Sequence, residues 1–75
     1  MERVKIDKKK NEVVLSFNEK FYNKKFINQA IEDFKESCDI KKDKDFIFLK
    51  PKKGIELDTL GYEFYNYVLG LIKNN

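Results

Sequence analysis

The sequence predicts an α+β domain of 75 residues in which two β-hairpins alternate with two helices, in the order ββαββα. Two observations support this fold class. Short apolar segments of strand length occur in two pairs, one with alternating apolar residues and one with a consecutive apolar run, and polar turn residues separate the members of each pair. Each pair precedes a longer segment whose apolar residues recur at helical spacing. We therefore expect a four-stranded, mainly antiparallel sheet with two helices packed on one face.

The first half of the chain predicts a hairpin and a helix. Residues 3–7 and 12–17 have apolar side chains at alternate positions, and the polar residues 8–11 form the turn between them. The helix begins after Asn23, a residue type that caps helix N-termini well. Its apolar stripe consists of Phe26, Ile27, Ala30, Ile31, Phe34 and Cys38.

The second half predicts another hairpin and a longer helix. Residues 38–50 form the hairpin, with a turn near residues 43–45. Residues 46–49 are apolar on consecutive positions, so this strand is either covered on both faces or leaves one face open to a partner. Pro51 ends the strand. The last helix is expected to run from an N-cap at Asp58 to about Lys73.

Length and composition exclude most catalytic chemistry. A chain of 75 residues makes one domain, residues 1–75, with a core too thin for a deep cleft. The sequence contains no histidine, which removes the commonest general base and metal ligand. Its one cysteine, Cys38, cannot make a thiolate metal site and is expected to be buried. We expect no enzyme activity, cofactor or metal.

The single cysteine and the hydropathy profile also bear on location. A lone cysteine forms no internal disulfide and fits a reducing compartment. No apolar run follows Met1, and no stretch approaches the length of a membrane span. We expect a cytoplasmic protein.

Fifteen lysines and a single arginine make up the positive charge, and the net charge is +3. The lysines either serve an acidic partner or nucleic acid, or reflect the lysine and asparagine bias of an AT-rich genome. A contact surface for a peptide or nucleic acid would combine Phe46, Phe48, Lys50, Lys52 and Lys53. Arginine dominates specific recognition of nucleic acids, so its scarcity makes that ligand unfavoured.

The last helix has two apolar faces where one would suffice. The first face contains Leu60, Phe64, Tyr67, Val68 and Leu71. The second, here named the tyrosine face, contains Tyr62, Tyr65, Leu69 and Ile72. Either the first helix packs against the tyrosine face, or this face is a surface for a partner, which tyrosine suits because its ring is apolar and its hydroxyl tolerates water.

The segment Glu63–Leu69, following a strand that ends in Leu49–Lys52, resembles the small HxsD-like proteins of His-Xaa-Ser type peptide-modification systems. This chain has Tyr67 where the family favours an acidic residue after the asparagine, Asn66. The resemblance implies a non-catalytic partner of radical SAM enzymes that modify a ribosomal peptide.

The favoured function is therefore an accessory module that binds protein or peptide. It would dock on a larger enzyme through the tyrosine face, hold a peptide at an exposed sheet edge, or do both. Either the first strand or the strand at residues 46–49 could be that edge. The alternatives are a small basic RNA- or DNA-binding domain and a homodimer that buries the tyrosine face against itself.

Overall fold

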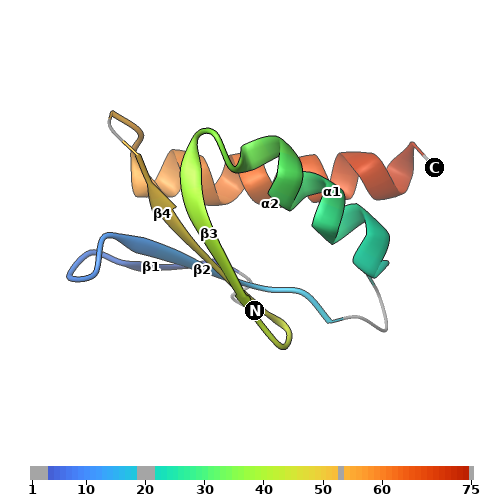
Figure 1. Cartoon of the computed structure of the whole chain (residues 1–75), viewed down its shortest axis with the longest axis horizontal. Helices are drawn as coiled ribbons and strands as arrows, with labels where there is room; N and C mark the ends of the chain where they lie inside the picture. Colours follow the sequence, from blue (N-terminus) through green and yellow to red (C-terminus); the bar gives the residue numbers. More distant parts are fainter. Residues whose placement is uncertain (1–3, 19–21, 53, 75) are drawn as a thin grey trace.

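The order of the elements confirms the predicted α+β fold (Figure 1). The computed structural model describes residues 4–18, 22–52 and 54–74. Its elements are β1 (Val4–Asp7), β2 (Glu12–Ser16), α1 (Lys24–Phe34), β3 (Cys38–Asp43), β4 (Phe46–Pro51) and α2 (Leu57–Lys73). Both helices lie on the same side of the sheet, and the other side is open within the described residues (Figure 1).

The four strands are antiparallel and lie in the order β1-β2-β4-β3. Val13 and Leu15 of β2 lie opposite Leu49 and Ile47 of β4, so the two hairpins join through their second strands. One prediction was wrong: β4 is an interior strand, and residues 46–49 offer no edge. The edges are β1, as expected, and β3.

Side-chain hydrogen bonds shape the hairpin turn and the start of α1. The carboxylate of Asp7 accepts from the backbone N–H groups of Lys9 and Lys10, at 3.1 and 3.2 Å. Asn23 caps α1 as predicted, because its side-chain oxygen accepts from the backbone N–H of Lys25 at 2.9 Å.

The start of α2 differs slightly from the prediction. Its N-cap is Glu56, which makes no side-chain capping hydrogen bond, and Asp58 lies inside the first turn. A carboxylate in the first turn stabilises a helix through the positive end of the helix dipole. Asp58 therefore supports this terminus from inside the helix.

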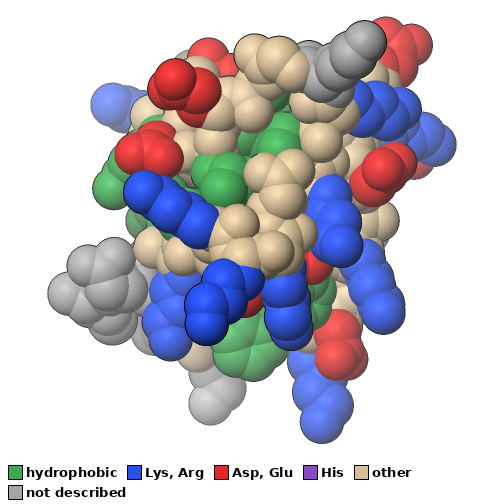
Figure 2. Space-filling model, turned by 90° about the vertical axis from the view of Figure 1, so that its left-hand side faces the viewer, with side chains coloured by type: hydrophobic (Ala, Val, Ile, Leu, Met, Phe, Trp, Pro, Cys, Tyr) green, Lys and Arg blue, Asp and Glu red, His purple; other side chains and the backbone are tan. Residues whose placement is uncertain are grey.

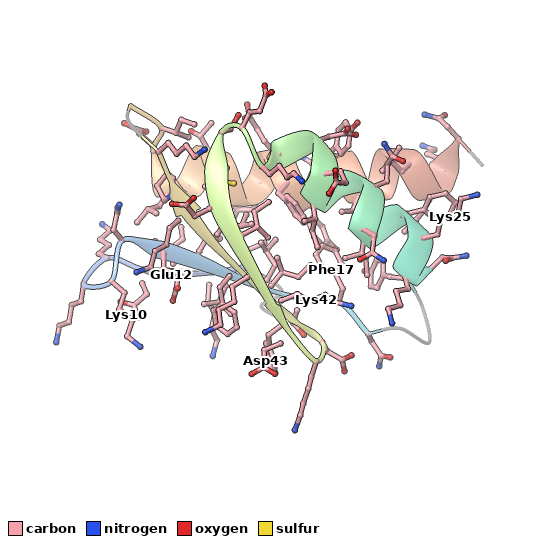
Figure 3. All side chains as sticks on the ribbon, viewed as in Figure 1. Lys10, Glu12, Phe17, Lys25, Lys42 and Asp43 are labelled. Carbon is pink, nitrogen blue, oxygen red and sulfur yellow. The ribbon has the colours of Figure 1, made fainter. Side chains whose placement is uncertain are left out.

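The core lies between the sheet and the helices. Its fully buried larger side chains include Phe17, Phe64, Leu15, Ile47, Leu49 and Leu60, and Phe34 packs against them half-buried. The ring of Phe17 contacts three others: those of Tyr22 at 5.1 Å, Tyr65 at 5.7 Å and Phe64 at 6.3 Å between centroids. Figure 3 shows Phe17 in the layer between sheet and helices.

Helix α1 joins α2 through the first apolar face of α2. Phe34 lies edge-on to Phe64 at 5.1 Å and to Tyr67 at 5.4 Å between ring centroids. The Tyr67 hydroxyl donates a hydrogen bond to the Asp33 carboxylate. This bond lowers the pKa of Asp33 and raises the pKa of Tyr67. The aromatic contacts of α1 therefore do not fall on the tyrosine face, contrary to the packing alternative.

Helix α2 lies over β1 and β2 at a glycine. A Cβ added at Gly61 would lie 2.8 Å from Cγ1 of Val4 and 3.0 Å from Cγ1 of Val13. Real Cβ atoms do not approach other carbons this closely, so a larger residue would push the helix off the sheet. A Cβ added at Gly70, by contrast, would have no neighbour within 4 Å.

These two glycines provide a matched pair of substitutions. We expect Gly61→Ala to destabilise the fold by about 1–3 kcal/mol, because overpacking outweighs the gain in helix propensity. Gly70→Ala should stabilise it by up to about 1 kcal/mol, the propensity difference alone. Urea unfolding followed by circular dichroism measures both values. Equal stabilisation by the two alanines would show that α2 does not approach the sheet at Gly61.

Candidate binding surfaces

A hollow of about 540 Å³ follows the free edge of β1. Its lining comes from both faces of the sheet: Lys5 and Val14 lie on the open face, and Ile6 on the helix face. Asp58 of α2 and the turn residues Lys8 and Lys9 complete it. A hollow bounded from both faces lies at the edge itself, beside the backbone N–H and C=O groups that β2 leaves unpaired.

The opposite edge, β3, has features that hinder strand addition. Its helix-facing positions include the half-buried Lys42, opposite Ile47 of β4. Its open-face positions, Asp39, Lys41 and Asp43, are all charged, as are Lys5 and Asp7 on β1, so the two edges differ only on the helix-facing side. Charged side chains on an edge strand, above all on its inner face, discourage pairing with another chain. On β1 the helix-facing residues are Val4 and Ile6, which are compatible with pairing.

The tyrosine face is divided between core and surface. Tyr65 is half-buried: its ring stacks on Phe17, and its hydroxyl lies 3.5 Å from that of Tyr22. Ile72 is also half-buried against the core. Tyr62 and Leu69 are exposed, by 58% and 37%. Two of the four predicted partner-binding residues are therefore accessible, and the other two support the fold.

The open face of the sheet has an apolar centre. Val14 lies opposite Phe48, and Phe46 lies opposite Ser16. Phe46 is 47% exposed and Phe48 is half-buried. A shallow hollow of about 350 Å³ around Phe48 is lined also by Lys10, Glu12, Lys41, Asp43 and Lys50. Phe46, Phe48 and Lys50 thus share one surface, as predicted.

The other two lysines of that prediction lie elsewhere. The Nζ of Lys52 donates to the backbone carbonyl of Lys35, just after α1, at 3.3 Å, and its backbone N–H donates to the carbonyl of Ser37 at 3.1 Å. Lys53 lies outside the described residues.

Charges on the open face are mixed. The strands place there the lysines Lys5, Lys41 and Lys50 and the carboxylates Asp7, Glu12, Asp39 and Asp43. Asp39 lies directly opposite Lys50. Figure 3 shows Glu12 and Asp43 on the side of the sheet away from the helices. A polyanion such as RNA requires an excess of positive charge, which this face does not offer.

The described residues contain few groups suited to catalysis. Cys38 is 1% exposed, and its Sγ donates to the backbone carbonyl of Phe34 at 3.4 Å. Burial raises the pKa of this thiol, so it stays protonated and unreactive. No cluster of three potential metal-ligating side chains occurs in residues 4–18, 22–52 and 54–74. A hollow of about 450 Å³ beside the N-terminus of α2 is lined by apolar residues, among them Phe34 and Leu60, and by the carboxylates Glu56 and Glu63.

Comparison of the chain with models of protein families, with curated proteins and with solved structures finds no match. Neither α1 nor α2 combines the length and the hydropathy that a bilayer-spanning helix requires. The function is therefore argued from the surfaces of this chain.

The sequence interpretation did not single out the residues around the β1 hollow. Lys5, Val14 and Asp58 come from three elements, and only the pairing of β1 with β2 and the position of α2 bring them together. The alternation of Val4 and Ile6 with charges was the available signal, since it marks a strand that is half-buried and suited to an edge.

The division of the tyrosine face leads to a second test. Tyr65→Ser should destabilise the fold by about 1–3 kcal/mol, because it removes a stacked ring from the core. Tyr62→Ser should change the stability by no more than about 0.5 kcal/mol, as at other exposed positions. Thermal melting of both variants measures the difference. Equal losses would contradict the separate roles described here.

Proposed function

We propose that this chain is a non-catalytic accessory module of the cytoplasm that holds an extended peptide along β1. The peptide adds as a fifth strand to the sheet, and main-chain hydrogen bonds supply much of the affinity. The observation that supports this proposal best is the hollow of about 540 Å³ along the free edge of β1.

The asymmetry of the two edges supports the choice of β1. Strand addition at β3 would bring the helix-facing side of the peptide against the charged Lys42, whereas the open-face positions of both edges are charged. At β1, side chains on the helix-facing side of the peptide would meet Val4 and Ile6, and Gly61 of α2 lies against Val4. A new strand would thus extend the apolar layer between sheet and helix instead of interrupting it.

A larger enzyme is the proposed second partner. The resemblance to HxsD-like proteins implies a radical SAM enzyme that modifies a ribosomal peptide, to which this module would present the peptide. Tyr62 and Leu69 are the exposed apolar side chains of α2 on the side away from its aromatic contacts with α1. They are the proposed contact with the enzyme, since exposed apolar groups often mark protein interfaces.

Peptide binding can be tested with a library of unselected sequences. We expect a random peptide library displayed on phage to yield peptides that bind the full chain with a Kd below about 100 µM. Bound peptide should slow amide hydrogen exchange in residues 4–7 and leave residues 38–43 unchanged. Methylating the backbone nitrogens of alternate peptide residues should abolish binding for one set and spare the other, because one edge of a strand faces β1.

Protection of residues 38–43 instead of residues 4–7 would place the peptide on the wrong edge and refute the proposal. Failure to select any binder would refute peptide binding altogether. Tolerance of both methylated sets would show that the peptide does not bind as a strand.

Docking on the enzyme is tested separately. We expect a gene for a radical SAM enzyme beside the gene for this chain, and we expect the two purified proteins to elute together in size-exclusion chromatography. The double variant Tyr62→Ser, Leu69→Ser should abolish co-elution and keep its fold, whereas Asn66→Ser, an exposed control on the same helix, should not. Undiminished co-elution of the double variant would exclude this surface.

A further inference from the structure

The charges around the β1 hollow are unequal. The charged residues that line it are three lysines, Lys5, Lys8 and Lys9, and two carboxylates, Asp7 and Asp58. The carboxylate of Asp7 accepts two backbone hydrogen bonds from its own turn and keeps its charge, so the lining carries a net charge of +1. Figure 2 views the molecule from the left-hand side of Figure 1, where the β1–β2 hairpin turns. Several lysine side chains lie in the lower half of this view. This end of the edge is therefore electropositive.

The two sides of the edge also differ in polarity. On the open side, Lys5 is the exposed β1 side chain beside Val14. On the helix side, Val4 and Ile6 are apolar and half-buried, and Gly61 of α2 lies against Val4. A strand added here places alternate side chains on these two sides.

We infer that the occupant of the β1 edge is a segment in which acidic residues alternate with apolar residues. The apolar side chains face α2 and extend the core over Val4 and Ile6. The acidic side chains face the open side and lie near Lys5, Lys8 and Lys9, with which they form solvent-exposed ion pairs. This inference rests on the proposed function and specifies the peptide class of the same site.

Charge and polarity together favour a peptide over a nucleic acid. A phosphate backbone would satisfy the lysines, but it would offer no apolar side chains to Val4 and Ile6. The rest of the open face does not attract a polyanion, because three carboxylates, Glu12, Asp39 and Asp43, share it with Lys41 and Lys50.

Three labelled nine-residue peptides test the inference by fluorescence anisotropy. In each, valine alternates with a second residue, which is glutamate, glutamine or lysine. We expect the glutamate peptide to bind about three- to tenfold more tightly than the glutamine peptide, and the lysine peptide to bind most weakly. The differences should shrink as salt rises from about 50 to about 500 mM, because exposed ion pairs are screened.

Variants of the chain locate the effect. Replacing Lys5, Lys8 and Lys9 together with glutamine should remove the preference for glutamate and leave the affinity for the glutamine peptide within about twofold. Lys44→Gln, at the exposed turn between β3 and β4, is the matched control and should keep the preference.

The outcomes separate the inference from the proposed function. Equal binding of all three peptides, with protection of residues 4–7 from exchange, would overturn the charge preference and leave strand addition intact. No binding by any of the three, with no binder from the phage library, would overturn both. Binding of single-stranded oligo-dT at about 150 mM salt, with the same protection, would replace the peptide with a nucleic acid.

Discussion

The close approach of α2 to the sheet at Gly61 determines most of this structure. With no side chain at this position, the helix backbone lies directly on Val4 and Val13. That contact places α2 over β1 and β2 and brings Leu60, Phe64 and Val68 into the core. The aromatic contacts of α1 are then made on an adjoining side of α2, through Phe34, Phe64 and Tyr67. A bulkier residue at position 61 would disturb all of these relations together.

This arrangement leaves one flank of the molecule incomplete. β1 lies at one edge of the sheet, and its helix-facing residues Val4 and Ile6 are only half-buried. A small domain has few ways to present both unpaired backbone and apolar side chains to one ligand, and this flank does both. The open sheet face also exposes Phe46, but its balanced charges make it a less selective surface.

Local patterns in the sequence were sufficient for the elements but not for their assembly. The alternation in residues 12–17, the Asn23 cap and the apolar stripe of residues 26–34 depend on neighbouring residues, and these features are correctly predicted. Cys38 was wrongly placed on that stripe, because α1 ends at Phe34 and Cys38 begins β3. The pairing of β2 with β4 joins residues far apart in the chain, such as Val13 and Leu49, and no local signal specifies it. For this reason β4 was wrongly considered as an edge. The tyrosine face posed the same difficulty: Tyr62 and Tyr65 have equivalent spacing, and only contact with Phe17 and Tyr22 distinguishes them.

Because Cys38 is buried, the reaction rate of its thiol reports how often the folded structure opens. Its thiol is the only one in the chain, and it lies where the end of α1 meets β3, hydrogen-bonded to the Phe34 carbonyl. An alkylating reagent reaches it only when β3 separates from the helices, so the rate of labelling counts those excursions. Since β1 lies at the far edge of the sheet from β3, a ligand bound at β1 slows this labelling only when Cys38 is exposed by global unfolding, which also destroys the β1 edge.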